Sequence, residues 1–179
     1  MRRLRLALVL AASGCAALPI EPPRSSIRVV SADGCAPFDW PVEAVVSSGF
    51  GPRDGHAHLG LDLAVPEGTP VRAACAGVVR YAGDGQRGYG RLVVVDHAGG
   101  LSTAYAHNRA LAVEVGAVVA RGQLLSYSGA TGHVTAPHLH FEVRRDGVAV
   151  DPLPLLAPGS DGARMGYALR SASADPSHP

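Results

Sequence analysis

Short apolar stretches separated by glycine-rich turns constrain the fold of this chain more than any other feature. The chain has 179 residues, of which 22 are glycine, and few of its segments are long enough for a helix. Short apolar runs bounded by turn residues are typical of strands in all-β domains. The sequence therefore predicts an all-β sheet or flattened barrel. We expect strands in seven stretches: Val42–Val46, Val71–Tyr81, Leu92–Asp96, Leu101–His107, Val113–Val119, Leu124–Ser128 and His138–Arg144.

Five side chains from three distant parts of the chain have the chemistry of a metal site. They are His58, Asp62, His107, His138 and His140. Zinc sites in hydrolases combine imidazole and carboxylate ligands and leave one coordination position open for water. Two close pairs can supply three such ligands and still leave histidines for proton transfer. The residues therefore predict an enzyme, although the helical His-Glu-x-x-His motif does not occur.

The last pair, His138 and His140, stands in a strand pattern. The apolar Leu139 and Phe141 alternate with polar residues, so both histidines should leave the same face of the sheet. Residues two apart on a strand are separated by about 6.6 Å, so one imidazole can bind metal while the other faces substrate. Glu142 shares this face. It is either a hydrogen-bond partner of His140 or an exposed glutamate, and we expect the exposed arrangement.

The first pair, His58 and Asp62, lies in a similar pattern but with a wider spacing. Residues four apart on a straight strand are roughly 13 Å from each other, too far to share one ion. Gly60 between them can bend the backbone and draw them together. We also expect this glycine to leave empty the volume where the ion would sit. The opposite, apolar face should consist of Leu59, Leu61, Leu63 and Val65.

The other histidines have weaker claims to function. His97 follows a predicted strand and precedes a Gly-Gly turn, which indicates a structural role. His178 lies in the polar tail. His56 and His133 flank the candidate site in sequence, and we expect both to be bystanders.

A series of short motifs extends from Ser47 to about Leu156. In order they are Ser48-Gly49-Phe50-Gly51-Pro52-Arg53, His58-Leu59-Gly60-Leu61-Asp62, Gly68-Thr69-Pro70-Val71, Tyr105-Ala106-His107, Gly122-Gln123, Gly129-Ala130-Thr131-Gly132, Pro137-His138-Leu139-His140-Phe141-Glu142 and Val150-Asp151-Pro152. In order and spacing they resemble the lysostaphin or LytM-type family of peptidoglycan zinc endopeptidases. The segment between Arg53 and His58 is short, so the sequence does not decide the shape of one groove wall or the substrate preference.

The resemblance implies both a fold and a set of roles. It implies an antiparallel sheet in a flattened barrel-sandwich with a duplicated hybrid motif and a substrate groove over it. It makes His58, Asp62 and His140 the ligands of Zn²⁺. It makes His107 and His138 the two catalytic histidines, one taking a proton from water and the other steadying the oxyanion. Which histidine does which stays open.

The composition and the N-terminus bear on partners and location. The net charge is only +1, so no basic field favours nucleic acid. Arg2, Arg3 and Arg5 precede a short apolar run, Leu6 to Ala12, which is typical of a secretory leader. Ala12-Ser13-Gly14-Cys15 resembles a bacterial lipobox, so we expect lipid on Cys15, with ordinary cleavage and release as the alternative. We therefore expect an exported lipoprotein that faces the periplasm from the outer membrane.

The domain organisation follows from composition. We expect a signal peptide at 1–14, a proline-rich tether at 15–40, the zinc endopeptidase domain at 41–157 and a disordered tail at 158–179. If Cys15 carries lipid, Cys35 and Cys75 remain, either as a disulfide in an oxidising compartment or as two separate thiols.

Two other functions compete with peptidoglycan hydrolysis. Exported relatives of the resembled family have lost their metal ligands and activate cell-wall amidases, but here the ligand residues are intact. A biotinyl or lipoyl carrier would need a lysine for attachment, and the chain has none. The sequence leaves open whether the cross-link cut is a glycine bridge or the bond between D-alanine and diaminopimelate.

Overall fold

The computed structural model describes residues 34–53, 55–85 and 88–158, and strands make up nearly all of its regular structure. The predicted leader, Cys15, the tail and His178 lie outside these residues. Within the described ranges no helix has the length and hydrophobicity needed to cross a membrane. The only helical turns described there are two short 3₁₀ turns, Ala98–Gly100 and Leu153–Leu155.

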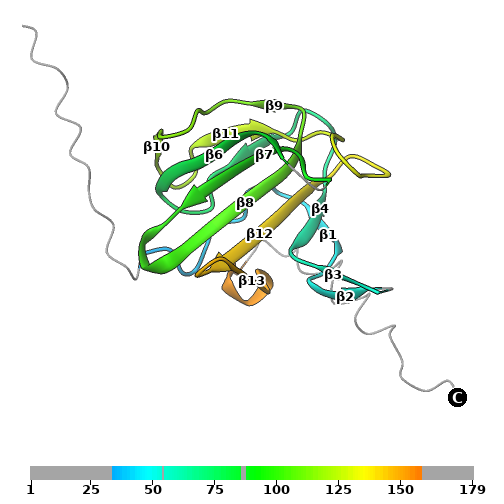
Figure 1. Cartoon of the computed structure of the whole chain (residues 1–179), viewed down its shortest axis with the longest axis horizontal. Coiled ribbons are helices and arrows are strands. Elements are labelled where there is room, and N and C mark those ends of the chain that lie inside the picture. Colours follow the sequence, from blue (N-terminus) through cyan, green and yellow to red (C-terminus); the bar gives the residue numbers. More distant parts are fainter. Residues whose placement is uncertain (1–33, 54, 86–87, 159–179) are drawn as a thin grey trace, which may run out of the picture.

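The strands form one large sheet and two small ones, and every pair of named strands is antiparallel. The eight-stranded sheet has the order β1-β4-β12-β8-β7-β6-β10, with β13 added at β12. A three-stranded sheet, β5-β11-β9, packs beside it, and β2 and β3 form a separate hairpin (Figure 1). The bounds are β1 Val45–Ser48, β2 Gly51–Arg53, β3 His56–His58, β4 Leu61–Ala64, β5 Pro70–Arg72, β6 Gly77–Gly85, β7 Gly90–Asp96, β8 Leu101–Asn108, β9 Ala110–Leu111, β10 Val118–Val119, β11 Leu124–Tyr127, β12 Leu139–Arg145 and β13 Val148–Val150. The all-β prediction is confirmed.

Three of the predicted strands differ from those observed. The stretch predicted as Val42–Val46 is a strand only from Val45, and β1 extends to Ser48. The stretch 71–81 is divided at residues 73–76 into β5 and β6. The stretch 113–119 contributes only Val118 and Val119, because Gly116 turns the chain with a φ of 87°. A β-branched run therefore does not extend across a glycine in the left-handed region.

The apolar core lies under one face of the central strands. Leu139, Phe141 and Val143 of β12 are fully buried, as period-two alternation predicts. Leu61 and Leu63 of β4 are also buried. Leu59, predicted on the same apolar face, is instead 38% exposed, because the chain bends at Gly60 and separates it from β4.

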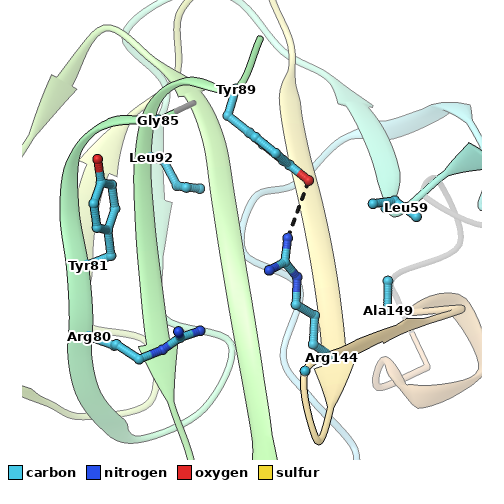
Figure 2. A pocket seen from close by; sticks show the side chains of 9 residues that line it. Leu59, Arg80, Tyr81, Gly85, Tyr89, Leu92, Arg144 and Ala149 are labelled. Atoms are coloured by element: carbon cyan, nitrogen blue, oxygen red, sulfur yellow. Dashed lines mark hydrogen bonds between the residues drawn. The ribbon is translucent and has the colours of Figure 1, made fainter. Parts of the chain in front are cut away.

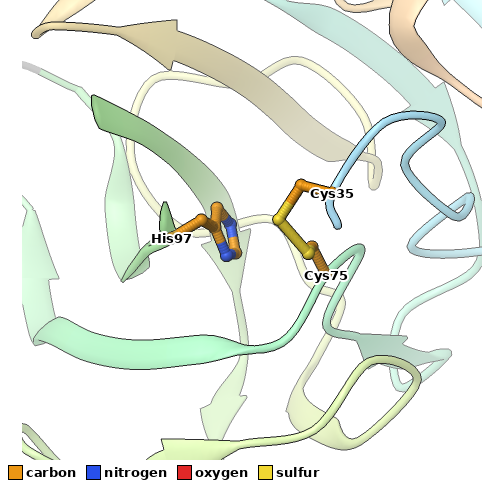
Figure 3. Close-up of side chains that lie close together, drawn as sticks. All are labelled: Cys35, Cys75 and His97. Carbon is orange, nitrogen blue, oxygen red and sulfur yellow. A yellow bond between two sulfur atoms is a disulfide. The ribbon is translucent and has the colours of Figure 1, made fainter. Parts of the chain in front are cut away.

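The segment before β1 belongs to the folded domain. Cys35 and Cys75 form a disulfide with a Cα–Cα distance of 5.4 Å (Figure 3), and Phe38 is buried in the core. Phe38 also pairs with Leu156, so the two ends of the described chain are joined. Residues 34–40, predicted as the end of a tether, are therefore packed. The alternative of two separate thiols is wrong.

Candidate active site

The three predicted ligands, His58, Asp62 and His140, lie together. His58 ends β3, Asp62 lies in β4, and His140 is directly opposite Asp62 on β12. His58 Nε2 lies 3.0 Å from Asp62 Oδ1 and 3.1 Å from His140 Nδ1. His140 Nδ1 lies 2.9 Å from Asp62 Oδ1. Ligand atoms around a tetrahedral zinc are separated by roughly 3.3 Å, so the donor set fits this ion.

Gly60 brings the first pair together. The bend at Gly60 separates β3 from β4 and allows residues four apart to meet. A Cβ at this position would overlap the carbonyl oxygen of Phe141 and lie 2.9 Å from Glu142 Cγ. The absent side chain therefore makes room for strand β12.

His107 and His138 lie beside the ligand group. Their ring centroids are 4.7 Å apart, and His138 Nε2 lies 3.5 Å from Asp62 Oδ1. His107 Nδ1 is 2.9 Å from the Thr131 carbonyl oxygen, and His138 Nδ1 is 2.9 Å from that of Ala136. Donation to these carbonyls places the proton on Nδ1 and leaves Nε2 of each ring as an acceptor.

The backbone of His107 explains how its ring reaches this group. On β8, Ala106 and not His107 is opposite His140, so regular alternation would send the His107 ring toward the core. His107 instead has a φ of 64°, a conformation that non-glycine residues seldom adopt. This local turn directs the imidazole to the face that carries His140, and nothing in the sequence pattern indicates it.

Burial and close packing set the charges of the site. In the metal-free protein burial opposes ionisation of Asp62, but N–H groups donated by His140 and His58 outweigh it and hold the pKa of this carboxyl well below its usual range. A bound ion would replace these protons and take the lone pairs of the same nitrogens. Burial, with His138 and His140 nearby, lowers the pKa of His107 to about 4, although the Thr131 carbonyl opposes the shift. Before any metal binds, the site therefore pairs an ionised Asp62 with a neutral His107 at pH 7.

Glu142 contacts the ring nitrogen of His140 that points away from the other two ligand residues. Its carboxylate is fully buried, and Oε1 lies 3.0 Å from His140 Nε2 and 2.7 Å from the Tyr89 hydroxyl. Its other oxygen, Oε2, accepts from Arg144 Nε at 2.7 Å. Burial raises the pKa of Glu142, but these partners outweigh it and lower the pKa. The expectation of an exposed glutamate is wrong, and the alternative, a partner of His140, is confirmed.

Two groups near His58 were not singled out from the sequence. His58 Nδ1 lies 2.6 Å from the Gly49 carbonyl oxygen and 2.6 Å from Arg53 Nη2, and these contacts hold the ring with Nε2 directed at Asp62 and His140. Arg53 places Nη2 3.4 Å from Asp62 Oδ2. Both residues belong to the Ser48–Arg53 motif, which was the available signal.

The remaining histidines of the described chain lie elsewhere. His56 and His133 are exposed. His97 packs beside the disulfide (Figure 3), with Nδ1 2.8 Å from the Ala76 carbonyl oxygen and Nε2 2.8 Å from Thr103 Oγ1. Because both ring nitrogens have partners and both sulfurs are bonded to each other, this cluster is structural, as predicted for His97.

A groove of about 780 Å³ begins beside the site. Leu59, next to His58, and Tyr89, which contacts Glu142, line its near end. Arg144 of β12 and Arg80 of β6 line it further away, and Figure 2 shows both guanidinium groups directed into it. None of the five site residues lines this groove, so Leu59 and Tyr89 are its nearest approach to the site.

Comparison with known proteins places this geometry in a family. The profile described as Peptidase family M23 matches residues 56–152, which include all five site residues. A zinc-containing peptidase from Vibrio cholerae superimposes with a TM-score of 0.62 at 34% identity, covering 67% of this chain and 40% of that one. The catalytic domain of lysostaphin from Staphylococcus simulans gives 0.59 at 34% identity, covering 62% and 90%. The fold is lysostaphin-like.

Curated relatives differ in their described roles. The Lipoprotein NlpD/LppB homolog of Pseudomonas aeruginosa is 40% identical over 75% of this chain and 45% of its own length. The DD-carboxypeptidase/endopeptidase Mpg of Neisseria meningitidis is 38% identical, covering 73% and 31%. The Murein hydrolase activator NlpD of Escherichia coli is 38% identical, covering 65% and 30%. The chain thus spans less than half the length of these relatives.

Proposed function

Since this chain belongs to peptidase family M23, we propose that it is a zinc-dependent endopeptidase that hydrolyses peptide cross-links of peptidoglycan. The observation that carries the proposal is the complete set of five groups: His58, Asp62 and His140 within ligand distance of one another, with His107 and His138 beside them. A site that had lost catalysis would not need the last two imidazoles held beside the ligand set.

The roles of these residues follow from their surroundings. His58, Asp62 and His140 would hold the ion through Nε2, a carboxylate oxygen and Nδ1, the atoms that converge. A zinc ion held there would supply a Lewis acid able to activate water and polarise a carbonyl group. His107 and His138 each hold Nδ1 against a carbonyl oxygen. One of them, with a free Nε2 lone pair, would take the proton from water, and the other, protonated on Nε2 as well, would donate to the oxyanion.

A second function, activation of another wall hydrolase, is favoured by one observation. The relative from Escherichia coli is described as a murein hydrolase activator. An activator needs a docking surface and does not need a metal centre, so retention of all three ligand residues favours the enzyme. Exported lipoproteins among the relatives support lipid on Cys15 and a position facing the periplasm.

The proposal is tested by incubating the purified full chain, loaded with zinc, with peptidoglycan sacculi of both types. Mass spectrometry of the released fragments should show hydrolysed cross-link peptides, and their ends identify the bond. A chain that releases nothing by itself, but stimulates a partner amidase, would establish the activator instead.

A further inference from the structure

Strand β8 has a bulge at His107, which its pairing with β7 reveals. Tyr105, two residues before it, is paired with Val93. Asn108, directly after it, is paired with Arg91, so two residues of β8 lie opposite one of β7. Such a bulge redirects a side chain and is common beside active sites. The positive φ of His107 belongs to this bulge, so its ring reaches the site only while the bulge is held in place.

The side chain of Asn108 holds both strands at this bulge. It is fully buried, and its Nδ2 lies 2.7 Å from the Tyr105 carbonyl oxygen and 2.9 Å from that of Arg91. Carbonyl oxygens only accept, so the amide nitrogen must face them, which leaves Oδ1 for the Ser126 hydroxyl at 2.7 Å. Every polar atom of this side chain is thus bonded, and it joins β7, β8 and β11 at one point.

Thr131 supplies a second set of contacts at the same place. Its carbonyl oxygen accepts from Nδ1 of the His107 ring at 2.9 Å. Its hydroxyl donates to the Asn108 carbonyl oxygen at 2.8 Å and accepts from the backbone N–H of Arg91 at 3.0 Å. The acceptor of the ring and the backbone that directs the ring are therefore held by one network of hydrogen bonds.

The turn before β7 packs against the Thr131 loop at backbone distance. A Cβ at Gly90 would overlap the carbonyl group of Thr131. Directly before Gly90, the Tyr89 carbonyl oxygen accepts from the backbone N–H of His107 at 2.9 Å. Because no side chain separates these segments, a shift of either loop would move His107. A strained residue persists only where its surroundings fix it in this way.

From these contacts we infer that Asn108 and Thr131 are positioning residues for His107. The amide of the first and the hydroxyl of the second hold the bulge of β8 and the acceptor of the imidazole together, so that the ring is presented to the site. The inference rests on the proposed function and deepens it. The hydrogen bonds of this network join β7, β8, β11 and the Thr131 loop, whereas the ligand residues lie on β3, β4 and β12. The two residues therefore act on proton transfer and not on metal binding.

The exchange of the His107 Nδ1–H with water tests this positioning without catalysis. It is followed by proton NMR in the zinc-loaded full chain and assigned by its absence in His107→Asn. Thr131→Val keeps the shape of the side chain but lacks the hydroxyl, so exchange should be about tenfold faster, the scale of one lost hydrogen bond. Thr131→Ser keeps the hydroxyl and should exchange at the unmodified rate. Asn108→Ala should accelerate exchange further, and if it does not fold, the Thr131 pair decides.

Cleavage of a soluble cross-linked peptide gives the second readout. Thr131→Val should lower kcat by about tenfold with KM and zinc content unchanged, because the ring is misplaced while the ligands are not. Thr131→Ser should restore kcat. The control is Thr69→Val, which removes a threonine hydroxyl that donates to the Pro66 carbonyl oxygen at 2.8 Å and should change neither readout.

Two results would overturn the inference: unchanged Nδ1–H exchange in Thr131→Val, or equal acceleration in Thr131→Ser. If the unmodified chain cuts no peptide but the exchange responds as expected, the proposed activity fails and the positioning of His107 stands.

Discussion

His140 and Glu142 are two residues apart on β12, and Nε2 of the first lies 3.0 Å from Oε1 of the second. The buried carboxylate accepts a hydrogen bond from Nε2–H of His140. The lone pair that this ring offers to an ion is therefore on Nδ1, the atom that lies against His58 and Asp62. The atom of His140 that would bind an ion is thus set by Glu142, which is not one of the three ligand residues.

Glu142→Gln should weaken zinc binding by about 10- to 100-fold, the usual effect of losing such an outer partner. A glutamine keeps the shape of the side chain but can donate to Nε2, which favours the wrong tautomer. Zinc affinity is measured by competition with a chromophoric chelator, with Arg145→Gln as the control. An unchanged affinity would show that Glu142 serves packing only.

Asp62→Ala should abolish stoichiometric zinc binding. The purified chain is expected to contain about one zinc, and removal of the only carboxylate in the ligand set leaves two imidazoles. Metal analysis of the dialysed protein checks this, and Glu114→Ala, an exposed carboxylate outside the site, should retain the ion. Full occupancy in Asp62→Ala would disprove the ligand assignment.

His138→Ala and His140→Ala should fail in different ways, although the two residues are only two positions apart in the same motif. His140→Ala loses both zinc and cleavage. His138→Ala and His107→Ala keep zinc and lose cleavage by about 100-fold or more, the scale of a missing general acid or base. Release of cross-link peptides and zinc content are measured on the same samples. Cleavage at the unmodified rate by zinc-loaded His138→Ala contradicts the mechanism.

The depressed pKa of His107, about 4, predicts a pH dependence of stability in metal-free protein. The unfolded chain binds a proton on this ring near pH 6.5 but the folded chain does not, so the stability falls as the pH decreases from about 6.5 to 4. His107→Asn removes the titrating ring and tolerates a positive φ. Urea unfolding across this pH range should therefore show a smaller loss of unfolding free energy for His107→Asn than for the unmodified chain. Parallel plots of unfolding free energy against pH would argue against the burial effect.

Removal of the disulfide should destabilise the domain by about 2–4 kcal/mol, because the bridge joins residues 40 apart. The double variant Cys35→Ala/Cys75→Ala is compared with the oxidised chain by urea unfolding. Alkylation without reductant should find neither thiol in exported protein. Cleavage of sacculi by the folded double variant should persist, since the bridge lies away from the five site residues.

The five site residues could be recognised from the sequence because their metal-binding and acid-base chemistry lies in short motifs. It also indicated the bend at Gly60, since two ligands four apart on a strand need one. The sequence did not indicate which distant residues surround these five side chains. Burial of Glu142 depends on Tyr89, 53 residues away, and only the order β12-β8-β7 brings the two together.

His107 shows a second limit of the same kind. Its place in an alternating strand predicts an inward ring, and a single dihedral angle reverses that direction. The packed segment 34–40 was missed for a related reason. Its prolines resemble those of a linker, while its burial depends on a disulfide to Cys75 and on a pairing with Leu156.

The closure of Phe38 on Leu156 has a consequence for an anchored molecule. Phe38 packs against His97, at the connection between β7 and β8, whereas His107 is near the other end of β8, roughly 20 Å away along the strand. The chain thus enters its domain at the end opposite the five site residues. If lipid on Cys15 holds the protein to a bilayer, the connection to that anchor leaves the domain at the end opposite the five site residues, and no anchoring segment has to cross the site.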